Sequence, residues 1–123
     1  MEKGQIFWAK DYENHQHPIV FLKAEDEEKF LACILSTKDT NGNVPMSPDH
    51  FFETKKDGSN YSIKFKTSHL IPSRIFIKEF AWLKSLHPDG MLTKSGIDFI
   101  DDNLNDAVPE FLNISIKADS KLK

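Results

Sequence analysis

The chain has 123 residues, of which 39% are apolar and 28% charged, and a formal net charge of −3. This balance is typical of a folded globular domain and excludes a disordered chain. No apolar run approaches the roughly 20 residues that a membrane-spanning helix needs. The acidic N-terminal segment also lacks the basic start and apolar stretch of a secretory signal. A single cysteine, Cys33, excludes an internal disulfide framework and a cysteine-based zinc site.

From these features we expect a cytoplasmic protein with one domain, residues 1–116, followed by a frayed tail at residues 117–123. The 19 acidic residues outnumber the 16 basic ones. The net negative charge therefore disfavours binding of nucleic acid, and binding of RNA would need a local basic groove.

Three strands are predicted in the first part of the chain. The first covers residues 5–9 and is entered through Gly4. The second is the apolar run at 18–22, which is too short for a helix and is expected to be buried on both faces. The third covers residues 29–35 and leads into a loop at 36–43 that is rich in turn-forming residues.

The middle of the chain is less regular. Residues 44–52 contain two prolines and two adjacent phenylalanines, which predicts an irregular stretch packed over one end of a barrel. A turn at 55–60 leads into residues 61–67, where apolar and polar side chains alternate as in a half-buried strand. Residues 68–77 predict a further strand, broken by Pro72. Residues 80–83 fit either the end of that strand or a short helix.

Apolar residues recur at helical spacing toward the C-terminus: Ile97, Ile100, Leu104 and Val108. Thr93 is a residue type favoured at a helix N-cap, and Pro109 would end the helix, so we expect a helix at about 93–108. Several short strands followed by one amphipathic helix predict a mainly β protein, a small β-barrel with a C-terminal helix. Side chains fill so small a barrel, so a ligand would bind on its outside or between protomers.

Five short motifs follow one another along the chain: GQIFW at 4–8, HPIVFL at 17–22, CILST at 33–37, PSRI at 72–75 and GMLT at 90–93. In this order they resemble the PemK/MazF toxin family. They are similar to its first strand, its second strand, a third strand ending in a hydroxyl-bearing loop, the strand ahead of the final helix, and the start of that helix. The resemblance covers nearly the whole chain and is carried by the shared order.

The resemblance implies an SH3-like β-barrel with a C-terminal amphipathic helix, which forms a homodimer and cleaves single-stranded RNA as the toxin of a toxin–antitoxin pair. The implied partner is a cognate antitoxin, a small protein whose disordered tail fills the RNA groove. Neither a metal nor another cofactor is implied. Such cleavage needs a base for the ribose 2′-OH, an acid for the leaving oxygen, and charge or hydrogen-bond donors for the phosphate.

In the family, an arginine before the proline of the second strand and a hydroxyl residue after the third strand perform these tasks. Here His17 stands in the arginine position, and Ser36 or Thr37 in the hydroxyl position. Imidazole can act as acid or base near neutral pH, but it lacks the permanent charge and planar fork of a guanidinium. Arg74, the only arginine, lies near where family members place a further active-site residue. The resemblance thus implies His17, Ser36, Thr37 and Arg74 as catalytic residues.

Each of these residues also has an ordinary structural explanation. His15 and His17 lie two residues apart and would share a strand face, which suits contact with RNA or a divalent metal, or a polar entry into the strand. Ser36 and Thr37 suit turn-closing hydroxyls as well as phosphate contacts. Arg74 suits either a surface ion pair or a phosphate clamp.

Lys64 and Lys66 belong with Lys55 and Lys56 to the densest basic stretch of the chain, in which Tyr61 and Phe65 lie between lysines. Such a strand could face RNA, because bases stack on aromatic rings while lysines follow the phosphate backbone. Alternatively, the aromatic rings belong to the core and the lysines to a solvated face. Two function hypotheses remain: a metal-independent endoribonuclease toxin, or a catalytically inactive barrel of the same fold that binds protein or RNA.

Overall fold

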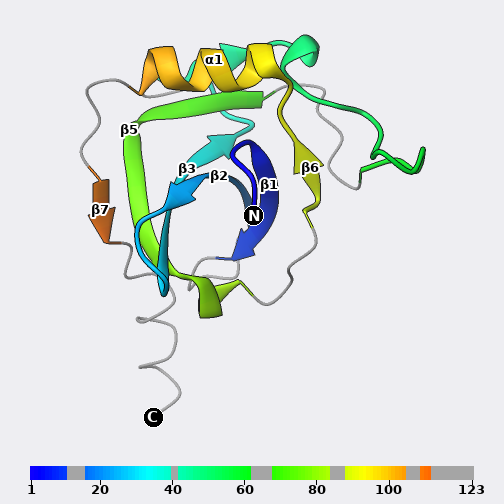
Figure 1. Cartoon of the computed structure of the whole chain (residues 1–123). Coiled ribbons are helices and arrows are strands. Elements are labelled where there is room, and N and C mark those ends of the chain that lie inside the picture. Colours follow the sequence, from blue (N-terminus) through cyan, green and yellow to red (C-terminus); the bar gives the residue numbers. More distant parts are fainter. Residues whose placement is uncertain (11–15, 40–41, 62–67, 84–87, 105–108, 112–123) are drawn as a thin grey trace.

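One curled sheet of seven strands and one α-helix make up most of the described part of the chain (Figure 1). The computed structural model describes residues 1–10, 16–39, 42–61, 68–83, 88–104 and 109–111. The strands are β1 (Gln5–Lys10), β2 (Gln16–Ala24), β3 (Lys29–Ser36), β4 (Val44–Met46), β5 (Ser68–Glu79), β6 (Gly90–Met91) and β7 (Pro109–Phe111). The helices are α1 (Lys94–Asn103) and two 3-10 turns, Pro48–His50 and Phe80–Trp82.

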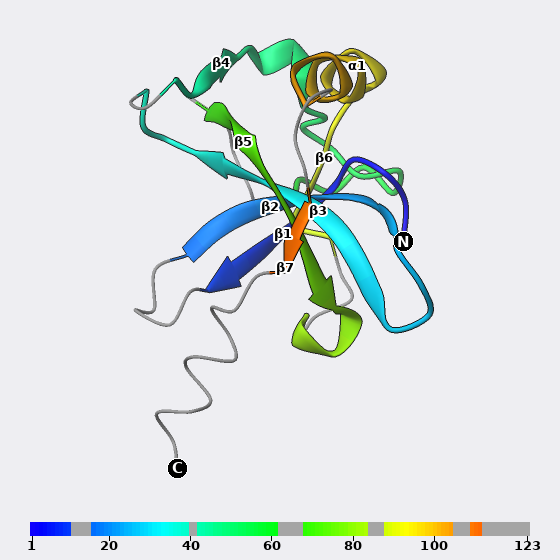
Figure 2. The same ribbon diagram turned by 90° about the vertical axis from the view of Figure 1, so that its left-hand side faces the viewer.

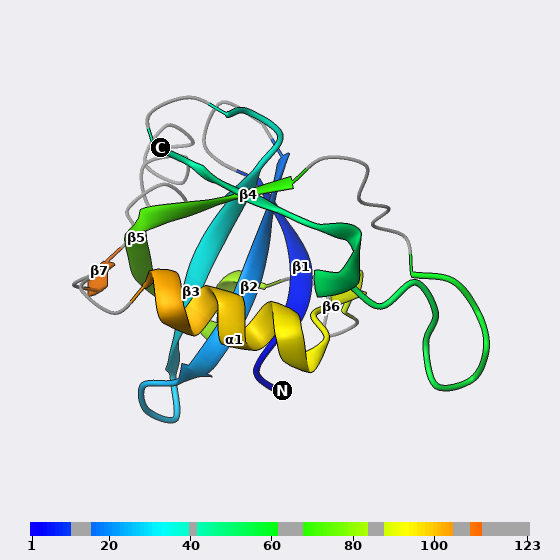
Figure 3. The same ribbon diagram turned by 90° about the horizontal axis from the view of Figure 1, so that it is seen from above.

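The strands lie in the order β4–β5–β3–β2–β1–β6, with every neighbouring pair antiparallel, and β7 runs parallel to β5. The sheet curls into a half-barrel, and α1 lies across it (Figures 1 and 3). A mainly β fold with one helix is therefore confirmed. The three strands predicted in the first part of the chain are β1, β2 and β3, each within two residues of its predicted bounds.

Some predicted features lie outside the described residues. They are the strand at 62–67 with Lys64 and Lys66, the residue His15, the last part of the predicted helix at 105–108, and the tail at 117–123.

Side chains of β3 alternate between two apolar clusters, one on each face of the sheet. The helix-side cluster lies toward α1 and includes Ile6, Val20, Leu31, Cys33, Leu35, Leu70, Leu92 and Ile100. The opposite cluster consists of Phe7, Ile19, Phe21, Phe30, Ala32, Ile34 and Leu83. Burial on both faces explains why β2 and β3 are continuous apolar runs in the sequence. For the second strand, this two-sided burial is as predicted.

Strand β5 corrects the prediction of a break at Pro72, because it continues from Ser68 to Glu79. Leu35 of β3 pairs with Leu70, whereas Cys33 pairs with Ile75, so residues 71–74 of β5 correspond to one residue of β3. The strand bends at this irregularity (Figure 1). In the described pairing, residues 71–74 have no partner on a neighbouring strand. Pro72 is accommodated there because no hydrogen bond of this described pairing needs the N–H that proline lacks.

The stretch at 44–52 is more regular than predicted. Val44–Met46 forms β4, which pairs with β5, and the 3-10 turn at Pro48–His50 follows it. Phe80–Trp82 forms a short 3-10 helix, which was one of the two alternatives for that segment.

The predicted N-cap of α1 is confirmed, because the Thr93 hydroxyl accepts a hydrogen bond from the Gly96 N–H at 3.2 Å. The helix ends at Asn103, earlier than predicted, and Pro109 begins β7 instead of ending the helix. At this end the Asn103 side chain donates to the Phe99 carbonyl at 2.8 Å. A side-chain amide that bonds the backbone in this way competes with further helical turns.

Candidate functional site

His17 and Ser36 lie at the same end of the β2–β3 pair. Because the two strands are antiparallel, the start of β2 meets the end of β3, and the last pair on this side is Ile19 with Ile34. His17 precedes Ile19 by two residues and Ser36 follows Ile34 by two, so both lie on the sheet face of the opposite cluster, to which Ile19 and Ile34 belong. Both residues are half-buried.

Beyond the pair Ile19–Ile34 the two strands separate. Figure 2 shows the start of β2 diverging from the end of β3, which runs on toward β4 and β5. The structure therefore places His17 and Ser36 on one face, on either side of a widening gap between neighbouring strands.

Ser36 and Thr37 differ in their surroundings. The Ser36 hydroxyl accepts a hydrogen bond from the Lys38 N–H at 3.1 Å, which is the turn-closing contact considered for it. A hydroxyl that accepts one bond still carries its own O–H as a donor, so Ser36 retains the capacity to bind a phosphate oxygen. Thr37 is the first residue after β3 and is exposed.

Arg74 lies on β5, in the irregular stretch next to Ile75, which pairs with Cys33. Its backbone is thus on the strand adjacent to β3, while its side chain is outside the described part of the structure. Of the four residues expected to be catalytic, Ser36 and Thr37 are consecutive, His17 lies at the same end of the sheet, and Arg74 is placed only by its backbone.

His69 is a candidate that the sequence analysis did not single out. It is the direct cross-strand partner of Ser36, so the two side chains stand on one face with Cβ atoms about 5 Å apart. The ring is half-buried, and within the described part of the chain its enclosed Nδ1 atom has no hydrogen-bond partner. The pairing joins residues that are far apart in the chain, and local spacing gives no sign of it.

His50, a histidine of the 3-10 turn Pro48–His50, has a structural role. The His50 ring packs on Phe99, with ring centroids 4.6 Å apart, and its Nδ1 accepts the Ser47 N–H at 3.1 Å. Its backbone carbonyl accepts the Thr93 N–H at 2.9 Å. The contacts with Phe99 and Thr93 tie the 3-10 turn to α1 and to its N-cap.

Three further features of the described residues bear on chemistry. The described residues contain no group of three or more His, Cys, Asp and Glu side chains that could hold a metal ion. Cys33 is fully buried, and burial raises the pKa of its thiol to about 12, which makes it unsuitable as a nucleophile. In the part of the chain that the structure describes, no helix has the length and apolar character needed to cross a membrane.

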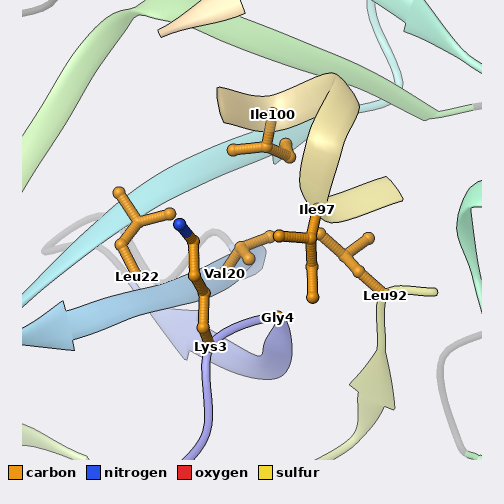
Figure 4. A pocket seen from close by; sticks show the side chains of 7 residues that line it. All are labelled: Lys3, Gly4, Val20, Leu22, Leu92, Ile97 and Ile100. Carbon is orange, nitrogen blue, oxygen red and sulfur yellow. The ribbon is translucent and has the colours of Figure 1, made fainter. Parts of the chain in front are cut away.

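A recess below α1 is formed by residues from the N-terminus, β2 and the helix (Figure 4). It is lined by Lys3, Gly4, Val20, Leu22, Leu92, Ile97 and Ile100. Its apolar side chains leave no space for a water molecule, and Lys3 Nζ reaches out to Asp101 Oδ1 at 2.9 Å. The recess is therefore a packing seam under the helix.

Comparison with known proteins identifies no relative of this chain: it matches no protein-family model, no curated protein and no solved structure.

Proposed function

We propose that this protein is an endoribonuclease that cleaves single-stranded RNA without a metal, as the toxin of a toxin–antitoxin pair of the PemK/MazF type. The ordered motifs of the sequence suggest the family. The structural observation that supports the proposal is the position of His17 and Ser36 on one sheet face, at the end of the strands where the motifs would require them.

In this proposal the half-barrel belongs to an SH3-like barrel, and the protein acts in the cytoplasm as a homodimer. The disordered tail of a cognate antitoxin covers the RNA-binding face and blocks it. His15, Lys64 and Lys66 contact the RNA.

The chemistry is an attack of the ribose 2′-oxygen on the adjacent phosphorus atom. A base removes the 2′-OH proton, the bond from phosphorus to the 5′-oxygen breaks, and an acid protonates that leaving oxygen. The products are a 2′,3′-cyclic phosphate and a 5′-hydroxyl. His17 acts as the proton-transfer group, Ser36 or Thr37 orients the phosphate by hydrogen bonding, and Arg74 stabilises the added negative charge.

The test is incubation of the purified protein with a mixed-sequence RNA in EDTA. We expect cleavage products that end in a cyclic phosphate, and a rate for His17→Ala about 100-fold lower, the usual contribution of a general acid or base. Lys23→Ala is the matched control, because Lys23 is an exposed residue of the same strand, and we expect it to keep the wild-type rate.

The absence of cleavage, together with normal growth on induced expression, would overturn the proposal. RNA binding without cleavage, equal for the wild type and His17→Ala, would instead favour the catalytically inactive binding module.

A further inference from the structure

His69 is positioned to serve the proposed site. It pairs with Ser36 on one side and with Pro45 on the other, so its strand is held between β3 and β4 at this end of the sheet. Two residues further along, Ile71 packs against the opposite cluster, which contains the neighbours of His17 and Ser36. His69, Ser36 and His17 therefore all belong to the rim of this cluster.

The surroundings of the ring define how it can interact. Nδ1 is buried and has no hydrogen-bond partner among the described residues, so Nε2 is the ring nitrogen that can reach a ligand. In a neutral imidazole one nitrogen carries the proton and the other accepts. An enclosed N–H without an acceptor is rarer and costlier in proteins than an under-used acceptor. The favoured tautomer therefore leaves Nδ1 unprotonated and carries the proton on Nε2.

We infer that His69 is a phosphate-binding catalytic residue that donates its Nε2–H to a non-bridging oxygen of the scissile phosphate, beside the Ser36 hydroxyl. This inference rests on the proposed function. In this arrangement His69 transfers no proton. It supplies a fixed donor for the charge that develops as the 2′-oxygen attacks.

The half-buried position makes such a donor effective. A hydrogen bond to an anion is stronger at the edge of an apolar cluster than in water, because the local dielectric constant is lower. Two donors from neighbouring strands, the Ser36 hydroxyl and the His69 N–H, can also hold two oxygens of the same phosphate at once.

The experiment compares three substitutions in the EDTA cleavage assay: His69→Gln, His69→Asn and His69→Leu. The Gln amide nitrogen can take the place of Nε2, the Asn amide nitrogen takes the place of Nδ1, and Leu offers no donor. We expect His69→Gln to stay within a few-fold of the wild type, whereas His69→Asn and His69→Leu lose about 100-fold in kcat, as when one donor to a developing oxyanion is removed. Circular dichroism and thermal melting identify any variant that fails to fold.

The pH–rate profile separates a donor from a proton-transfer group. We expect His69→Gln to keep the pH dependence of the wild-type rate, and His17→Ala to change it. A His69→Gln variant that is as impaired as His69→Leu, or whose rate depends differently on pH, would overturn the donor role while leaving the nuclease proposal standing. If the wild type itself does not cleave RNA, both proposals fall.

Discussion

At the scale of single residues, Gly96 determines how closely α1 approaches the 3-10 turn at Pro48–His50. A Cβ atom added at Gly96 would overlap the backbone carbonyl of His50. That carbonyl already accepts the Thr93 N–H at 2.9 Å, so it is not free to move aside. The glycine is therefore a requirement of packing, in a helix position where alanine would otherwise be favoured.

We expect Gly96→Ala to lower the free energy of unfolding by about 2 kcal/mol, because the overlap outweighs the gain of about 1 kcal/mol in helix propensity. Urea denaturation followed by circular dichroism measures the change. Asp102→Ala is the control, since Asp102 is an exposed residue of the same helix, and its change should remain within about 0.5 kcal/mol. Equal stability of Gly96→Ala and the wild type would contradict the close approach.

Residue-level features could be predicted from the sequence only where they are local. Thr93 was identified as the N-cap because its residue type and its distance from the apolar residues of the helix are local signals. The requirement for Gly96 depends on His50, and the position of His69 depends on Ser36. Both partners are far away in the chain, and neither contact leaves a local pattern.

At the scale of elements, hydrophobic patterning located β1, β2, β3, β5 and the start of the helix, but not the short strands β4, β6 and β7, nor how the elements bend or end. Continuous apolar runs predicted β2 and β3 because both faces of these strands are buried. The proline in β5 was expected to interrupt the strand. In the structure the register shift absorbs it, and a shift of pairing depends on β3 as much as on β5.

The attachment of α1 to the sheet depends on Ile100, which is 1% exposed and belongs to the helix-side cluster. We expect Ile100→Ala to reduce the free energy of unfolding by about 3 kcal/mol, because it removes buried contacts and leaves a cavity. Ile100→Val, which removes one methylene, should cost about 1 kcal/mol. Chemical denaturation measures both, and equal small effects of the two substitutions would show that the helix does not pack on this cluster.

At the scale of the whole molecule, the sequence predicted the fold class, because a mainly β pattern followed by one amphipathic helix leaves few arrangements. It did not predict the parallel pairing of β7 with β5, since strand order is set by long-range contacts. The same limit applies to the candidate site. Motif order suggested His17 and Ser36, whereas the sheet register was needed to add His69.

The centre of the sheet is occupied by Cys33, which offers a pH-dependent measure of global stability. Burial raises the pKa of its thiol from an ordinary 9.0 to about 12 in the folded protein. Below pH 9 both the folded and the unfolded chain keep the thiol proton, so the contribution to stability is fully present. Above pH 9 the unfolded chain releases the proton first, and this contribution is lost as the pH rises toward 12.

We therefore expect the free energy of unfolding of the wild type to fall above pH 9 relative to that of Cys33→Ala, by about 1.4 kcal/mol per pH unit at most. The variant loses some packing at every pH, but it has no thiol to titrate, and the lysines and tyrosines common to both proteins cancel in the difference. Urea denaturation at intervals from pH 8 to pH 10.5 measures it. Parallel curves over this range would mean that the thiol reaches solvent in the folded state, and that the two clusters do not enclose the middle of β3.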